Sequence, residues 1–518
     1  MNVDAQRASL SLKTFTAFVC CFFVFCLPGF GQDALPSPIP QLKPAILPPL
    51  QSPTEELRES VQRLQQGENS ATLPGRGKIF TIGSAVETAL ANYPSIVAHQ
   101  HREKAVSSKV TLAKTQYLPR LDLFAQELRG SDNNVLGILF PPLSIPQVAG
   151  ALGKPISFDS VWAVNVSAFA SWEVADFGLR HQQVEAARAE TSEAGAGVVL
   201  TKFQVASAAA DAFLALLASN QEVVAQKANT DRMQVFSVSV HSLVDSDLRP
   251  GVDASRADAE LALALDRQIN AEQEREVRRA ILAERLGLAG PYVDIDAGSL
   301  LTIPGRLPEP NLPPFAFHPL ALHQAAIIKT VRAKEEVLKK EWRPRIYLEA
   351  ALFSRGSGAE LRRSVAKIGY LPSVPNWAVG VKAQFHTLDV FAIRAREKEV
   401  ISQARQEQSR YDEVMQILKG RDAQARALIE GAGRLALNAP VLLKAAQETE
   451  LRSRTRYGVG LNTVVDVAEA ERLLVQAQVK FNLAGLAVWK AYLSAAEAHG
   501  DLTPFLQMVA GADSNKGR

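Results

Sequence analysis

The chain carries the same series of landmarks twice, and this internal duplication restricts its possible folds more than any other feature. Pro94 and Pro119 are 25 residues apart in the first half, and Pro319 and Pro344 are 25 residues apart in the second. An aromatic residue lies two positions before the second proline of each pair, and an arginine follows that proline directly. We therefore expect two copies of one unit.

Further landmarks recur in the same order. Trp162-Ala-Val-Asn-Val is matched by Trp377-Ala-Val-Gly-Val. The intervals from the aspartate of a turn to a later glycine, 253–287 and 466–500, are both 34 residues. Two unrelated domains would share these intervals only by accident, so the order and spacing together indicate a duplication.

Each copy contains two short segments in which apolar and polar residues alternate. These segments cover about 119–128, 161–172, 345–353 and 376–386. A period of two with one apolar face predicts β-strands, and a length of roughly 10 residues is the reach of a tilted membrane strand. Trp162, Trp172 and Trp377 at the segment ends fit an aromatic girdle at a membrane interface. The alternation alone also allows a soluble hairpin packed on a core.

Long helical segments follow each pair of strands. Residues 173–248 contain no proline, and a helix of that length would measure on the order of 110 Å. The second long segment, 389–456, contains Pro440, which predicts a kink or an interruption. On the helix that returns from it, apolar residues step by three and four, which predicts a coiled-coil seam: Val467, Ala470, Leu474, Ala477, Phe481, Ala484, Val488, Ala491 and Ala495. The return helix of the first copy loses this seam to polar residues: Gln268, Arg275 and Arg278.

A turn joins the two helices of each copy. In the second copy, Tyr457-Gly-Val-Gly precedes Thr463, which can cap the next helix, and Asp466 places negative charge in the first turn of that helix. In the first copy, the turn is Arg249-Pro-Gly-Val-Asp253.

The N-terminal residues have the features of a secretory signal. Arg7 and Lys13 precede an apolar run at 15–27, and small residues favour cleavage before Gln32. The alternatives are a retained anchor and a lipid anchor on a cysteine. All three cysteines lie before the cleavage site: Cys20, Cys21 and Cys26. The mature chain would then form no disulfide.

These features divide the chain into six predicted segments. They are a signal peptide at 1–31, a proline-rich tether at 32–83, the first repeat at 84–289, an irregular linker at 290–317, the second repeat at 318–503 and a C-terminal tail at 504–518.

The composition excludes several classes of function. The formal net charge is only +3 without a basic block, which argues against nucleic-acid binding. His99 and His101 are two residues apart, so on a helix they diverge and cannot share a metal. The sequence has no glycine-rich phosphate loop, no His-Glu-x-x-His motif and no nucleophile elbow. We therefore expect neither an enzyme nor a protein with a cofactor or metal.

The duplicated order of helix, two strands, long helix, glycine turn and return helix resembles the TolC-like outer membrane efflux protein family, over about residues 80–505. The motifs that carry the resemblance are Leu118-Pro-Arg-Leu at the first strand and Tyr457-x-Val-Gly with Val465-Asp-Val at the turn. The resemblance implies a mainly helical chain with membrane strands. In this family, a homotrimer pools four strands per chain into a 12-stranded outer membrane β-barrel, continued by a long helical barrel in the periplasm.

The resemblance also implies an aperture and a docking surface at the periplasmic tip. The aperture residues carried over are Tyr457, Asp466, Glu469 and Asp253. Residues that would contact a periplasmic adaptor are Arg249, Pro250, Gly251, Gly458, Val459 and Gly460. Family members can hold an arginine two residues after the second glycine of the turn, but this chain has Asn462 there.

Two functions follow as hypotheses. The first is an outer membrane exit duct of a tripartite efflux or type I secretion system, a passive conduit whose energy comes from an inner-membrane transporter reached through a periplasmic adaptor. Drugs, metals and secreted polypeptides leave through similar ducts. The second is a soluble periplasmic coiled-coil scaffold or adaptor without a pore, and fractionation distinguishes the two.

Overall fold

The computed structural model describes residues 79–131, 160–288, 290, 293–302, 312–357, 371–372, 374–385 and 387–516. They all belong to one compact unit, 73–518. The predicted signal peptide and nearly all of the predicted tether lie outside the described residues.

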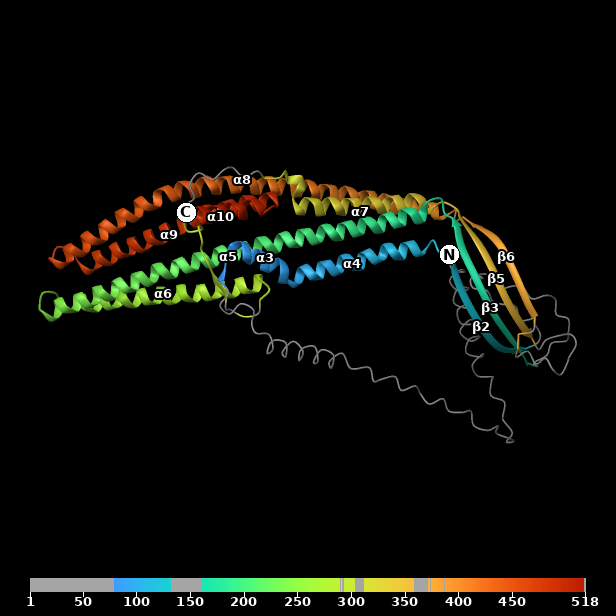
Figure 1. Ribbon diagram of the computed structural model, residues 1–518, viewed down its shortest axis with the longest axis horizontal. Helices are drawn as coiled ribbons and strands as arrows, with labels where there is room; N and C mark the ends of the chain where they lie inside the picture. Colours follow the sequence, from blue (N-terminus) through green and yellow to red (C-terminus); the bar gives the residue numbers. More distant parts are fainter. Residues whose placement is uncertain are drawn as a thin grey trace, which may run out of the picture. The chain divides into compact units, whose positions relative to one another are not determined.

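The described part of the chain is mainly helical, with one four-stranded sheet (Figure 1). The first copy comprises β1 (Ile79–Phe80), α3 (Ile82–Asn92), α4 (Pro94–Thr115), β2 (Arg120–Ser131), β3 (Ser160–Ala175), α5 (Leu179–Asp245), α6 (Gly251–Arg285) and β4 (Asp294–Ile295). The second comprises η1 (Phe315–Phe317), α7 (Pro319–Glu341), β5 (Arg345–Ser357), β6 (Val374–Gln384), α8 (Asp389–Gly458), α9 (Val464–His499) and α10 (Thr503–Lys516). The prediction of a mainly helical chain with four longer strands is confirmed.

The two copies share one antiparallel sheet with the strand order β2-β3-β5-β6. Its register aligns Leu123 with Ala168, Ala168 with Leu352 and Leu352 with Trp377. Directly opposed residues of an antiparallel sheet lie on the same face. The apolar positions of all four strands therefore form one continuous surface, and Trp377 is 78% exposed on it.

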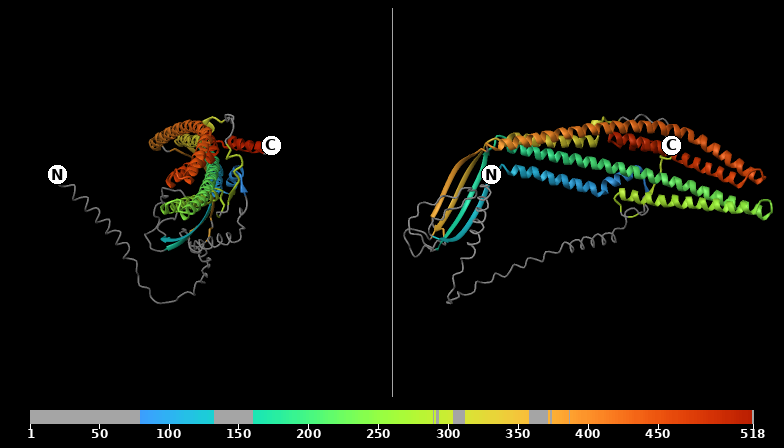
Figure 2. Two further views of the ribbon diagram at one scale, coloured as in Figure 1. Left: turned by 90° about the vertical axis from the view of Figure 1, so that its left-hand side faces the viewer. Right: turned by 180° about the vertical axis from the view of Figure 1, so that it is seen from behind.

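The helices lie side by side in the same order as the strands to which they connect. Nearest the sheet, α4 packs on α5, α5 on α7 and α7 on α8. Beyond the middle of the unit, α6 packs on α5, α5 on α9 and α9 on α8, as the two views in Figure 2 show. In both halves α8 lies at one edge of the helical layer, while α4 or α6 lies at the other.

The largest apolar core lies where the two halves of the helical layer meet. Phe80, Phe213, Trp489 and Phe505 are each almost completely buried there. Trp489 and Phe505 pack edge to face with ring centroids 6.4 Å apart. On α9, every predicted seam residue is buried except Phe481, which is 38% exposed. The seam prediction is therefore confirmed at all but one position.

Several predicted boundaries differ from the structure. The long helix begins at Leu179 rather than at residue 173, because β3 continues to Ala175 in pairing with β5. Gly178, with φ +95°, then turns the chain into the helix. The helix α8 runs through Pro440 without interruption and curves along its length in Figure 1. The proline therefore does not end the helix.

The segments expected to be irregular contain regular structure. Ile79–Phe80, assigned to the tether, forms β1 and pairs in parallel with β4, which lies in the predicted linker. The predicted C-terminal tail is largely helix α10, anchored by the buried side chains of Phe505 and Val509. The two strands have only two residues each, which is too short for a periodic signal, and contacts with distant segments stabilise them.

Among the described helices, α5 alone has a stretch apolar and long enough to cross a membrane by composition. Half of that stretch is buried among other helices, which is the pattern of a helix that belongs to a packed core.

Candidate functional site

The turn between α8 and α9 is shaped by a glycine and a helix cap. Gly460 has φ +85°, a conformation that side-chain-bearing residues rarely adopt. The hydroxyl of Thr463 accepts a hydrogen bond from the Asp466 amide (3.3 Å), and the Asp466 carboxylate accepts one from the Thr463 amide (2.8 Å). This reciprocal capping box confirms the predicted role of Thr463. The backbone hydrogen bond from Thr463 holds the pKa of Asp466 below its usual range.

The two acidic residues predicted at the aperture are both exposed, and each already has a partner. Asp466 caps α9 as described above, whereas Glu469 pairs with Arg472 at 2.5 Å. Three residues separate them, so both project from one side of α9. In its first turns, α9 therefore presents two exposed carboxylates, with the Arg472 guanidinium beside one of them.

Tyr457 joins the two hairpin tips instead of facing solvent. Tyr457 is only 3% exposed. Its hydroxyl donates a hydrogen bond to the Asp253 carboxylate at 3.3 Å. The Phe236 ring meets it edge on, with centroids 5.5 Å apart. Burial raises the pKa of Tyr457, and the Asp253 charge raises it further. In the single chain, this side chain packs between helices.

Arg249 completes this link between the tips. Its guanidinium lies 4.3 Å from the centre of the Tyr457 ring and donates to the backbone carbonyl of Tyr457. A cation over an aromatic face is attracted to it. The sequence predicts only an external contact role for Arg249, because nothing in its own neighbourhood indicates a partner 208 residues away.

The remaining predicted tip residues lie on the surface: Pro250, Gly251, Gly458, Val459 and Gly460. Asn462, at the position where relatives can hold an arginine, donates to the Ser453 hydroxyl of its own α8 at 3.1 Å. It therefore fastens the turn to the helix that precedes it. Around the turns, several large apolar side chains are exposed: Leu248, Val252, Val459, Leu461 and Val465.

The sheet has two chemically different faces. The apolar face carries Leu121, Leu123, Leu352, Val379 and Val381, all exposed. The opposite face carries two pairs of oppositely charged side chains. Lys382 bonds to Glu349, while Arg120 bonds to Asp122 at 2.9 Å.

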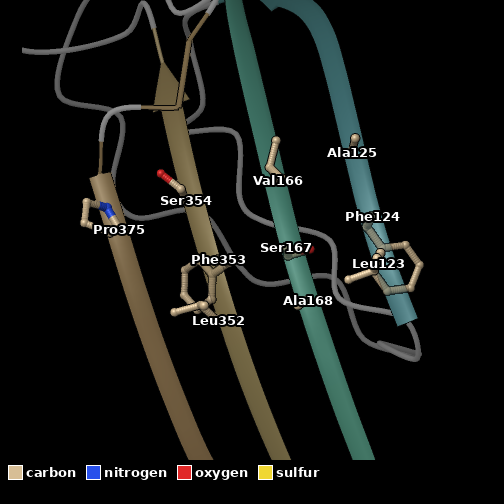
Figure 3. Close-up of a pocket in the computed structure, with 10 residues that line it drawn as sticks. All are labelled: Leu123, Phe124, Ala125, Val166, Ser167, Ala168, Leu352, Phe353, Ser354 and Pro375. Carbon is tan, nitrogen blue, oxygen red and sulfur yellow. The ribbon is translucent and has the colours of Figure 1, made fainter. Parts of the chain in front are cut away.

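A hollow of about 540 Å³ crosses the sheet and contains no charged side chain among its lining residues (Figure 3). Phe124, Ser167 and Phe353 are among those residues. The register places these three side chains on the face of the sheet opposite Leu123 and Leu352.

A buried ion pair that the sequence prediction missed fixes the junction between β3 and α5. The Asp176 carboxylate accepts from the amides of Gly178 (2.9 Å) and Arg180 (2.8 Å), and from the Arg180 guanidinium (2.7 Å). Burial disfavours its charge, but the hydrogen bonds from Arg180 outweigh burial and hold the pKa of Asp176 below its usual range. The Arg180 guanidinium also lies 4.7 Å from the centre of the Tyr117 ring. The sequence feature that could have indicated this ion pair is the run Asp176-Phe-Gly-Leu-Arg180 at the end of a strand.

Among the described residues, no group of three or more histidines, cysteines and acidic residues is arranged to hold a metal ion.

Comparison with known proteins gives one family match. A family model described as "Outer membrane efflux protein" matches residues 85–288. No curated protein sequence matches the chain.

Solved outer membrane channels have the same fold. The Campylobacter jejuni CmeC outer membrane channel is 13% identical, with 84% of this chain and 89% of that chain covered and a TM-score of 0.64. The outer membrane protein VceC from Vibrio cholerae is 14% identical, with 81% and 96% covered and a TM-score of 0.64. The open state of the Neisseria gonorrhoeae MtrE outer membrane channel is 17% identical, with 81% and 89% covered and a TM-score of 0.60. At these identities the likeness establishes the fold.

Proposed function

We propose that this chain, whose residues 85–288 match the model of the outer membrane efflux protein family, serves as a homotrimer as the exit duct of a tripartite pump. The sheet lies in the outer membrane, and the helices extend into the periplasm. The single observation that carries the proposal is a four-stranded sheet with one exposed apolar face, continued strand for strand by long helices.

The sheet requires other copies of the chain. Its outer strands, β2 and β6, each pair on one side only within the described residues. Unpaired backbone groups are not tolerated in hydrocarbon, so the edges must close. Two copies would give eight strands, which enclose little more than side chains, whereas three copies give twelve and leave room for a channel.

The helical layer supports the same arrangement. Its edges are α8 on one side and α4 or α6 on the other, aligned with the two edges of the sheet. Both edges carry exposed apolar side chains, of which Leu435 and Leu437 on α8 and Ile269 on α6 are examples. Contact between the α8 edge of one copy and the α4 and α6 edge of the next would bury them.

The aperture is formed by Asp466 and Glu469 at the α9 tips. In three copies, these carboxylates would form rings that favour cations, partly offset by Arg472. Asp253, Tyr457 and Arg249 hold the first hairpin tip against the second in the arrangement seen here.

The test is a planar bilayer recording. Asp466→Asn with Glu469→Gln removes both charges, while the asparagine oxygen still accepts from Thr463. The expected result is higher conductance or weaker cation preference, because fixed negative charge at the constriction is lost. The matched control is Glu274→Gln, since Glu274 also pairs with an arginine on its own helix (2.7 Å) but lies on α6, away from the tip. Unchanged conductance and selectivity in the double variant would contradict the aperture assignment.

A periplasmic adaptor and an inner-membrane transporter complete the proposed pump. The exposed Leu461, Val459 and Leu248 near the tips offer an apolar docking surface, beside the predicted contact residues Arg249, Pro250, Gly251, Gly458 and Gly460. Energy comes from the transporter, because the sequence has no phosphate-binding loop. Leu461→Asp should reduce recovery of the adaptor in a pull-down without changing trimer assembly.

A further inference from the structure

Three helices from both copies bring four charged side chains together above the second turn. Arg232 on α5 donates to the Glu471 carboxylate on α9 at 2.9 Å and reaches the Gln478 carbonyl oxygen at 3.5 Å. On α8, Glu450 lies 3.7 Å from Arg454 and within hydrogen-bonding reach of Glu471. The cluster thus connects the first hairpin to both helices of the second.

One oxygen of this cluster has no hydrogen-bond donor. Glu471 is only 2% exposed, and its Oε1 is shielded from solvent with no donor among the described residues. The other oxygen, Oε2, is bound by Arg232. The Glu450 carboxyl on α8 is a close neighbour of Glu471, and it offers only acceptors when it is ionised.

A second carboxylate close to a buried carboxyl raises the pKa of the buried group and favours its protonated form. A proton on Glu471 supplies a donor and converts its contact with Glu450 into an O–H···O⁻ hydrogen bond. We propose that Glu471 is protonated and donates to the Glu450 carboxylate, forming a proton-dependent latch that joins α9 to α8 while Arg232 joins the pair to α5. The guanidiniums of Arg232 and Arg454 stabilise the remaining negative charge, and their presence disfavours a metal cation at the same place.

The electrostatics of Glu471 agree with this assignment. Burial raises the pKa of Glu471, Arg232 opposes that rise, and the neighbouring Glu450 raises the pKa further. A carboxyl whose pKa is raised on folding stabilises the fold at low pH, and this stabilisation is lost as the pH rises through the pKa of the folded state. The latch is therefore closed in acid and released as the pH rises.

The position of the latch gives it a consequence for the aperture. Glu450 precedes Tyr457 by seven residues, and Glu471 follows Val464 by seven, so both lie about 10 Å from the turn. Loss of the proton places two negative charges against each other close to the tip of the α8–α9 hairpin. This step rests on the proposed channel function, whereas the proton site itself does not.

Infrared difference spectroscopy of the detergent-solubilised full-length protein tests the site directly. The C=O stretch of a protonated carboxyl is separate from the carboxylate bands, and we expect a component of it to be absent in Glu471→Gln. Burial also raises the pKa of Glu497 to about 7, so the assignment uses the difference between wild type and variant. The matched control, Glu469→Gln, removes an exposed glutamate two residues away and should retain the whole band.

Glu450→Gln changes the other member of the pair. It should also remove the same component of the protonated-carboxyl C=O band. The melting temperature of the wild type should fall from pH 5 to pH 8 by more than that of either latch variant. Bands and melting profiles that are the same in the wild type and both latch variants would overturn the proposal. A lost band with an unchanged pH dependence of conductance would retain the proton site and refute its role at the aperture.

Discussion

The return helices of the two copies, α6 and α9, are nearly equal in length but differ in how much of each is buried. Seventeen of the 36 residues of α9 are buried, compared with six of the 35 residues of α6. The reason is their place in the layer: α9 lies between α5 and α8, whereas α6 packs mainly on α5 and leaves its other side open. This difference explains why the apolar seam of α9 is nearly complete in the sequence and that of α6 is interrupted.

The same comparison bears on the proposed trimer. The second copy supplies an interior helix, and the first supplies an edge helix whose outer face keeps apolar residues such as Ile269 and Leu263 exposed. In a protein that acted alone, these residues would face water. In the proposed trimer they face the next copy.

The largest expected effect separates the interior helix from the edge helix. Leu474→Ala on α9 removes a side chain packed against Ala446 and Ala477, and we expect the free energy of unfolding to fall by about 2–5 kcal/mol. The matched change on α6 is Ile269→Ala, which alters an exposed side chain and should cost less than about 0.5 kcal/mol within one chain.

Chemical denaturation in detergent measures both values, and size-exclusion chromatography measures assembly. If α6 is an intersubunit edge, Ile269→Ala weakens the trimer while the individual chain unfolds as before. Equal losses of chain stability in the two variants would contradict the distinction between the helices.

A second, smaller effect compares the glycines that end α6 and α9. Gly500 has φ +78°, and a Cβ there would lie 2.5 Å from Pro319 and 2.8 Å from His318. Gly287 has φ +68°, and its nearest neighbour, the Asn92 backbone, would lie at 3.0 Å. Left-handed backbone costs about 1–2 kcal/mol in any alanine variant, and steric overlap adds about 1–3 kcal/mol.

We therefore expect Gly500→Ala to lower the melting temperature more than Gly287→Ala. Both variants are strained by the backbone, so their difference isolates the tighter packing in the second copy. A greater loss in Gly287→Ala would reverse the expected order.

The smallest effect concerns the helix cap of the second turn. Thr463→Ala removes the acceptor for the Asp466 amide, and a loss of about 1 kcal/mol is expected. Thr455→Ala is the control, because its hydroxyl bonds only to the Leu451 carbonyl within the same helix. The α6 start has no side-chain cap, since Pro250 occupies that position. Equal melting temperatures of Thr463→Ala and Thr455→Ala would show that the cap does not stabilise the fold.

The sequence predicts the features that depend on local periodicity. The alternation of Trp162 with its neighbours indicates a strand, and the three-and-four steps from Val467 to Ala495 indicate a helix with one buried face. Thr463 is recognisable as a cap, because the residues that satisfy it are only three positions away. These elements account for most of the described fold.

Features that depend on distant partners could not be predicted in the same way. The pairing of β1 with β4 involves two residues on each strand, and the contact of Arg249 with Tyr457 spans 208 positions. Glu471 occupies a position on α9 that looks like an ordinary helical glutamate, and only the packing of α5 and α8 reveals that it is buried. The exposed carboxylates at the tip were predicted by resemblance, and their role in an aperture remains a proposal.

The central claim is that this sheet and its helices form closed barrels only when copies of the chain combine in the outer membrane. Native mass spectrometry of the protein extracted from the outer membrane fraction tests it most directly. The account predicts a complex of three copies. A single chain, recovered in the aqueous periplasmic fraction with its apolar sheet face exposed to water, would contradict it.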